Sequence, residues 1–206
     1  MIGSSWTHKL ARIVVRPLVN TPITPNHLTA VRLAVGLASC WYFSLGTRSG
    51  DITGGWIWLL SAFLDRADGE LARISGKTSA WGHTFDYYSD EICNAVFFLA
   101  IGLGFAHKGG ALADWSIAMG AWTAVGLLIC GYCSEQLERL SPPGQKAYAG
   151  IWGFDFDDML YLLAPLAWLD VLSFVLVAAG LVVPIIAVVT GVRYLRKRAE
   201  VMASAG

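Results

Sequence analysis

The chain has 206 residues, of which 55% are apolar and only 15% are charged. A typical soluble domain carries about 25% charged residues, so this composition excludes a free-standing soluble enzyme and a disordered chain. The formal net charge is zero, which gives nucleic acid no overall basic surface to bind. The composition predicts an integral membrane protein, with membrane lipids as its surroundings and no nucleic-acid partner.

Residues 1–26 are expected to form a juxtamembrane segment. Apolar residues recur there at helical spacing, and basic residues fall on another face of the same helix. A basic amphipathic helix of this kind lies on the inner leaflet of a membrane. The apolar positions are Trp6, Leu10, Ile13, Val14 and Leu18, and the basic positions are Lys9, Arg12 and Arg16.

Six apolar stretches follow within residues 27–195, which we expect to form one transmembrane catalytic domain. A membrane-spanning helix needs about 20 mostly apolar residues. The expected spans are 28–46, 52–64, 92–106, 115–133, 151–169 and 171–192, and residues 196–206 are expected to form a basic tail. Arg32 lies near the start of the first span and is expected to snorkel to the membrane surface. The predicted fold class is an all-α integral membrane protein with six transmembrane helices.

The basic residues predict the orientation of these helices. If the N-terminus is inside, most lysines and arginines of the connecting segments fall on the cytoplasmic side, and only Arg48 and Lys108 fall on the other. Because basic residues concentrate in cytoplasmic loops, both termini are predicted to be cytoplasmic.

Four aspartates lie on two neighbouring predicted helices. Asp65 and Asp68 are three residues apart, and Asp86 and Asp90 are four apart, so each pair shares a helix face. At about 1.5 Å per residue, Asp65 lies about 18 Å below the outer end of its span and Asp86 about 10 Å above the inner end of the next. The short turn between them, with Ser79 as a helix cap, makes the helices antiparallel. The four carboxylates should therefore converge in the cytoplasmic third of the membrane.

Clustered carboxylates at this depth need cations, because burial and mutual repulsion both oppose ionisation. Mg²⁺ or Mn²⁺ suits oxygen ligands beside phosphate, and two ions could bridge a pyrophosphate. Pairing with local bases is the alternative, but Arg66 and Arg73 cannot neutralise four carboxylates. Arg73 suits phosphate, whereas Arg66 is expected on the cytoplasmic surface.

These residues form the pattern D-x2-D-G-x2-A-R-x8-G-x3-D-x3-D, which runs from Asp65 to Asp90. It resembles the signature of the CDP-alcohol phosphotransferase family, with every fixed position filled. The stretch from Thr24 to Thr29 also resembles the P-N-x-x-T entry to the first span in that family. The six-span layout after a juxtamembrane helix is similar as well, so the resemblance covers nearly the whole chain.

The resemblance implies an enzyme that transfers a substituted phosphate from a CDP-linked donor to an alcohol and releases CMP. By similarity, Asp65, Asp68 and Asp86 bind metal, while Asp90 completes the metal site and is the general base. The nucleotide and its diphosphate would contact Asp65, Gly69, Ala72, Arg73, Gly82, Asn26 and Thr29. Members of the family are usually homodimers, which is therefore also expected here.

The substrates are left open by the sequence. Arg139, Lys146, Arg193 and Asp155 could bind the acceptor, although pairing among these residues explains them as well. The favoured donor is CDP-diacylglycerol with a polar alcohol or polyol phosphate as acceptor. The alternative is a CDP-linked head group, such as CDP-choline, CDP-ethanolamine or CDP-inositol, transferred to a lipid or polyol alcohol. A cation or proton transporter that uses the buried acids is a remote alternative.

Overall fold

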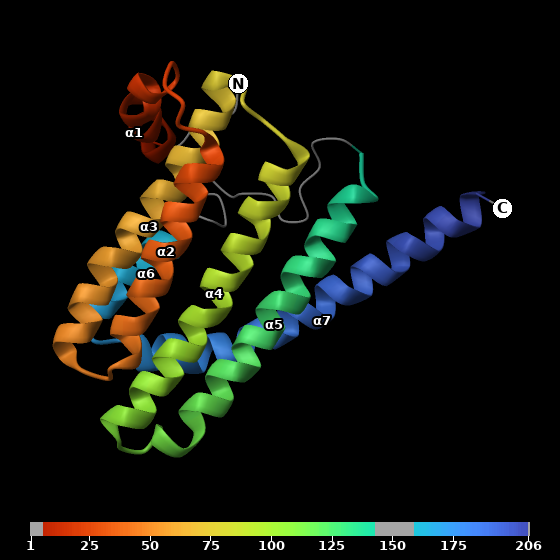
Figure 1. The fold of residues 1–206 in the computed structure, drawn as a ribbon. Coiled ribbons are helices and arrows are strands. Elements are labelled where there is room, and N and C mark those ends of the chain that lie inside the picture. The colour runs from red at the N-terminus through yellow and green to blue at the C-terminus, as the bar shows by residue number, and fades with distance from the viewer. Residues whose placement is uncertain (1–5, 143–158, 206) are drawn as a thin grey trace.

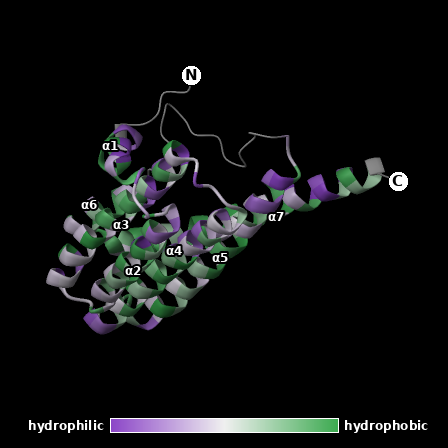
Figure 2. Cartoon of the chain, turned by 45° about the horizontal axis from the view of Figure 1, so that its top comes forward, coloured by the Kyte–Doolittle hydropathy of each residue, from purple (hydrophilic) through white to green (hydrophobic). Residues whose placement is uncertain are grey.

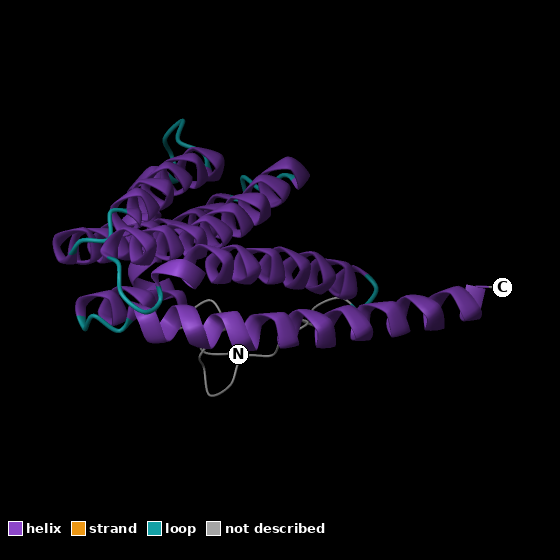
Figure 3. Ribbon diagram, turned by 90° about the horizontal axis from the view of Figure 1, so that it is seen from below, coloured by secondary structure: helices purple, strands orange, loops and turns teal. Residues whose placement is uncertain are grey.

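The structure is a computed structural model that describes residues 6–142 and 159–205, and all regular secondary structure in these residues is helical (Figure 3). The helices are α1 (Trp6–Val15), the short 3₁₀ helix η1 (Arg16–Leu18), α2 (Pro25–Ser44), α3 (Arg48–Ser75), α4 (Ala80–Lys108), α5 (Ala113–Arg139), α6 (Met159–Trp168) and α7 (Leu172–Ala205). The predicted all-helical class is confirmed.

Helices α2 to α5 run up and down as neighbours joined by short turns (Figure 1). Helix α1 lies at the end of the bundle where α3 ends and α4 begins, α6 packs on α3, and α7 packs on α5 before running out past the bundle (Figure 1). Hydrophobic residues dominate the middle of the helices, whereas hydrophilic residues gather at their ends and along α1 (Figure 2). This distribution is the one a bilayer requires.

Capping residues fix where the helices begin and end. Thr24 and His27 form a capping box at the start of α2. Ser79 Oγ accepts a hydrogen bond from the Gly82 amide at 2.9 Å, which confirms the predicted cap of α4. Gly76 ends α3 in the left-handed region, with φ of 66°, where glycine avoids the Cβ penalty. The antiparallel turn between α3 and α4 follows from these ends.

Three described helices, α4, α5 and α7, are long and apolar enough to cross a membrane. Helices α2 and α3, of 20 and 28 residues, lie at the positions of the first two predicted spans. Helix α2 packs against α4, and α3 packs against α2. Helix α6 covers the end of the fifth predicted span, whose start lies outside the described residues. Helix α7 covers the sixth and continues through most of the predicted tail.

Glycines bring the backbones of α2 and α4 together at the end of the bundle away from α1. A Cβ atom on Gly104 would lie 2.3 Å from the carbonyl oxygen of Phe43, and one on Gly46 would lie 2.2 Å from that of Gly104. Phe43 and Phe97 are fully buried nearby in an edge-to-face contact. Close packing through small residues is the usual way in which membrane helices associate.

Gly104→Ala should therefore destabilise the bundle by about 1–3 kcal/mol, because the added methyl group meets a backbone oxygen that cannot move aside. The measurement is the midpoint of thermal unfolding in detergent. Ala118→Val, at an exposed position of α5, is the control and should leave the midpoint unchanged. A Gly104→Ala protein as stable as the wild type would contradict the close approach of α2 and α4.

Candidate active site

The two aspartate pairs, on α3 and α4, meet beside α2, which packs against both of these helices. Asp65, Asp68 and Asp86 each offer one carboxylate oxygen, and these three oxygens lie within 4.8 Å of one another. Asp68 is buried, while Asp65 and Asp86 are partly exposed. Three oxygen donors at this separation fit a hard divalent cation such as Mg²⁺ or Mn²⁺.

The fourth aspartate, Asp90, is joined to the others by Arg32 from α2. Arg32 Nη1 donates to Asp90 Oδ1 at 2.5 Å and lies 3.4 Å from Asp65 Oδ1, while Nη2 lies 3.6 Å from Asp86 Oδ1. Arg32 is only 3% exposed. The prediction that it snorkels to the surface is therefore wrong: its guanidinium turns inward because carboxylates of opposite charge surround it there.

Residues of the P-N-x-x-T stretch support the same cluster. Thr29 Oγ1 donates to Asp68 Oδ2 at 2.7 Å and is itself buried. Asn26 lies against Gly82 on α4, since a Cβ on that glycine would come within 2.8 Å of Asn26 Oδ1. In this structure Thr29 thus contacts a predicted metal ligand, and Asn26 contacts another residue of the motif.

A second ionic cluster lies on α3 just beyond the aspartates and fastens α1 to it. The carboxylate of Glu70, 2% exposed, is the shared acceptor of this cluster. Its oxygens lie 3.0 Å from His8 Nδ1, 2.8 Å from Arg12 Nε and 2.9 Å from Arg73 Nη2. Two cationic side chains and an imidazole around one buried carboxylate make a strong, directional attachment.

Two arginines of α3, Arg66 and Arg73, make contacts that the sequence analysis did not predict. Arg66 was expected at the cytoplasmic surface, but it is buried and its Nη1 lies 3.2 Å from His8 Nε2. Arg73, the predicted diphosphate ligand, pairs with Glu70, and its Nη2 would lie 3.3 Å from a Cβ placed on Gly69. The space left by Gly69 therefore holds the Arg73 side chain, with Ala72 next to it in sequence.

An apolar groove lies along the outside of α3, between this helix and α1. It has a volume of about 350 Å³ and is lined by Thr7, Leu10, Trp56, Leu59, Leu60, Phe63 and Tyr161. Tyr161 also lines a small cavity of about 20 Å³, and Asp65, Asp90 and Arg32 line the same cavity. The Tyr161 hydroxyl donates to the Ala62 carbonyl oxygen at 2.8 Å.

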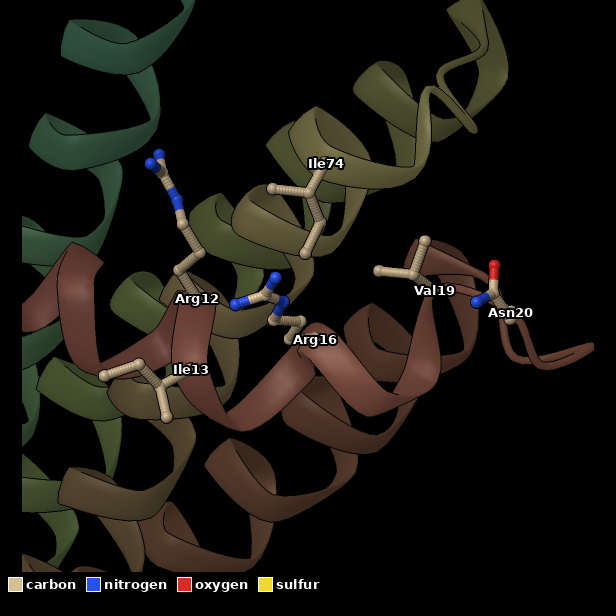
Figure 4. A pocket seen from close by; sticks show the side chains of 6 residues that line it. All are labelled: Arg12, Ile13, Arg16, Val19, Asn20 and Ile74. Carbon is tan, nitrogen blue, oxygen red and sulfur yellow. The ribbon is translucent and has the colours of Figure 1, made fainter.

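A larger pocket, of about 440 Å³, lies between α1 and the end of α3. Its lining contains no carboxylate of the acidic cluster. In Figure 4 the side chains of Arg16 and Ile74 face one another across it. The lining residues are Arg12, Ile13, Arg16, Val19, Asn20 and Ile74.

The predicted acceptor residues are only partly described. Arg139 is exposed at the end of α5 and pairs with Glu135 on the same helix, with Nε 3.0 Å from Oε1. Arg193 is exposed on α7. Lys146 and Asp155 lie outside the described residues.

Arg32 and Glu70 are the residues of this region that sequence reasoning missed. The signal for Arg32 was available: it follows Thr29 by three residues, so both share a face of α2, and a charge inside a span usually faces the protein interior. Glu70 gave no comparable signal, because its partners His8 and Arg12 are distant in sequence and belong to a separate helix.

Comparison with known proteins agrees with this geometry. The family model described as CDP-alcohol phosphatidyltransferase matches residues 22–192. An archaetidylinositol phosphate synthase from Pyrococcus horikoshii is 32% identical over 124 residues, which are 59% of this chain and 60% of that protein. A CDP-diacylglycerol–serine O-phosphatidyltransferase from Helicobacter pylori is 28% identical over 47% of this chain and 42% of its own length. The chain thus matches less than two thirds of the length of these relatives.

Solved structures share the fold over nearly the whole chain. A phosphatidylinositol phosphate synthase from Mycobacterium tuberculosis with CDP-DAG bound has a TM-score of 0.67 at 18% identity, covering 92% of this chain and 93% of that one. A structure of the same protein with manganese and citrate has a TM-score of 0.65 at 19% identity, covering 93% and 88%. With the family model matching most of its length and the motif carboxylates gathered at one place, this chain belongs to the CDP-alcohol phosphatidyltransferase family.

Proposed function

We propose that this protein transfers a phosphatidyl group from CDP-diacylglycerol to the hydroxyl of a polar alcohol or polyol phosphate and releases CMP. The observation that carries the proposal is the convergence of Asp65, Asp68 and Asp86 within 4.8 Å of one another. Three carboxylates at this separation could hold a divalent cation against the pyrophosphate of a CDP-linked donor.

The aspartates of α3 and the first aspartate of α4 would hold the metal. Asp65, Asp68 and Asp86 supply oxygen ligands, and the cation, when bound, would neutralise charge on the pyrophosphate and the leaving group. Mg²⁺ is the proposed ion, with Mn²⁺ as a substitute and two ions in the full site. The complex of the Mycobacterium tuberculosis synthase with manganese supports a divalent cation in this fold.

Asp90 is the proposed general base. It would accept the proton of the acceptor hydroxyl while that oxygen forms a bond to the phosphorus carrying the diacylglycerol. The bond from this phosphorus to the bridging oxygen breaks, and CMP leaves with the electron pair. A positioned base of this kind contributes about 10²–10⁴-fold to the rate.

The remaining motif residues would bind the nucleotide. Gly69, Ala72 and Gly82 are the proposed small residues at the nucleotide, where the side chains of Arg73 and Asn26 now lie against the two glycines. Asn26 and Thr29 approach the cluster from α2. Arg73 is the proposed diphosphate ligand, which requires its guanidinium to exchange part of its contact with Glu70 for the substrate. Arg139, Lys146, Arg193 and Asp155 remain the proposed acceptor residues.

The lipid donor is favoured by the relatives of this chain and is compatible with the apolar groove on α3. Trp56, Leu60 and Phe63 of α3 line this groove and share one face of the helix, which is about 180° around the axis from Asp65. The groove could hold an acyl chain against the outside of α3. The Helicobacter pylori relative, a CDP-diacylglycerol–serine O-phosphatidyltransferase, and the CDP-DAG bound to the Mycobacterium tuberculosis synthase support this choice of donor.

The proposed topology has six spans with both termini and the active site facing the cytoplasm. Helix α2 packs lengthwise against the apolar helix α4, and α3 packs lengthwise against α2. Both would therefore cross the membrane together with α4. Arg12 and Arg16 lie on α1 and just after it, at the end of the bundle that holds the aspartates, as the positive-inside rule requires of a cytoplasmic side. A homodimer is part of the proposal.

The first experiment measures Mg²⁺-dependent CMP release from CDP-diacylglycerol with a pool of polar alcohols and alcohol phosphates. Asp90→Asn should lower kcat by at least about 10²-fold, because the amide cannot accept the hydroxyl proton. Dividing the pool then identifies the acceptor.

Two results would overturn parts of this proposal. Full CMP release by folded Asp90→Asn would contradict the role of the base. No release by folded wild-type protein would contradict the lipid donor, and the assay would then turn to a CDP-linked head group with a lipid alcohol.

Metal binding can be tested without substrate. Asp68→Asn should weaken Mn²⁺ binding by at least about tenfold, since it removes a charged oxygen ligand from the cluster. Mn²⁺ binding is followed by electron paramagnetic resonance of the free ion. Glu70→Gln makes the same chemical change two residues away, outside the cluster, and should bind Mn²⁺ as the wild type does. Equal binding by all three proteins would contradict the proposed metal site.

A further inference from the structure

We propose that Arg32 is a positioning residue of the transfer reaction: it fixes the carboxylate of Asp90 and balances the charge of the aspartate cluster from behind. The inference rests on the proposed function for the role of Asp90. It adds a residue of α2, outside the aspartate signature, to the machinery that the reaction requires.

The guanidinium of Arg32 contacts three of the four aspartates through two nitrogens. Nη1 donates to Asp90 Oδ1 at 2.5 Å and stays within 3.4 Å of Asp65 Oδ1. Nη2 donates to the backbone carbonyl oxygen of Asp86 at 3.3 Å and lies 3.6 Å from its Oδ1. The shortest contact is thus to the proposed base, and the others tie that base to the proposed metal ligands.

Contacts with α3 and α4 fix the backbone of α2 at Arg32, and this fixes the position of its guanidinium beside the aspartates. Ser61 Oγ of α3 donates to the carbonyl oxygen of Arg32 at 3.0 Å. One turn later, a Cβ on Gly36 would lie 2.7 Å from Cys93 Sγ of α4 and 2.9 Å from Ser61 Oγ. The guanidinium therefore extends from a segment wedged between the two helices that carry the aspartates, and its own position is fixed.

Only arginine meets these demands. Its planar group offers several N–H donors in a fixed fork, whereas a lysine offers one compact ammonium group. The charge matters as well, because Arg32 is almost fully buried and charges interact strongly where water is scarce. With Arg32 in place, the aspartates can stay gathered before any metal binds, and Asp90 is held by Oδ1 while Oδ2 takes the proton.

The test compares Arg32→Lys, which keeps the charge and loses the fork, with Arg32→Gln, which loses both. Arg198→Gln, on the exposed end of α7, is the matched control. Each protein is assayed for kcat and donor KM in the transfer reaction. Mn²⁺ affinity is measured separately, without substrate, and thermal unfolding reports whether each variant is folded.

Both Arg32 variants should lose about 10²-fold in kcat with little change in donor KM, as a misplaced catalytic group does. Arg32→Gln should also bind Mn²⁺ at least about threefold more tightly, because a positive charge that repels the ion is gone. Arg32→Lys and Arg198→Gln should bind Mn²⁺ as the wild type does. If Arg32→Gln does not fold, Arg32→Lys decides the kinetic question alone.

A folded Arg32→Lys with wild-type kcat would overturn the positioning role. Mn²⁺ affinity unchanged in folded Arg32→Gln would overturn the charge balance. Failure of the proposed function is a distinct result: the wild type would then release no CMP from any donor. The Mn²⁺ titrations would still decide whether Arg32 neutralises the cluster.

Discussion

Gathering four carboxylates inside a bundle of apolar helices is the constraint on which the rest of this structure depends. Like charges at such short range repel, and burial removes the water that would otherwise screen them. One face of α2 offsets this repulsion with a hydrogen bond and a positive charge. Thr29 donates to Asp68, and the guanidinium of Arg32 lies close to Asp65, Asp86 and Asp90. Helix α2 therefore organises a site whose acidic groups it does not itself carry.

The bundle has two ends with different tasks. Away from α1, bare glycine backbones of α2 and α4 touch and aromatic rings fill the core. At the end near α1, buried ionic groups replace these apolar contacts, with Asp68 and Glu70 facing different partners two residues apart on α3. Close packing at the apolar end fixes the axial positions of the helices relative to one another. These positions bring the charged side chains together at the other end.

The sequence predicted most of this arrangement where local rules decide it. Apolar length predicted the helices, Ser79 predicted the cap of α4, and the spacing of Asp65, Asp68, Asp86 and Asp90 predicted that their side chains share a region. Contacts between distant segments could not be obtained in this way. The docking of α1 through His8 and Glu70 and the burial of Arg66 depend on how separate helices pack, which one-dimensional periodicity does not contain. Arg32 was misread because its nearness to the helix end suggested solvent, while its helix face pointed to the aspartates.

The contacts of α2 also limit which insertions and deletions the sequence of this helix can accept. Thr29 and Arg32 must face the aspartates, and Gly36 must face Cys93 and Ser61. Inserting or deleting one residue between them would turn everything beyond it by about 100° around the helix axis. Exposed positions such as Val31 and Leu37 can be exchanged freely among apolar residues, but the length of this segment cannot change. Insertions and deletions are therefore confined to segments outside the stretch of α2 from Thr29 to Gly36.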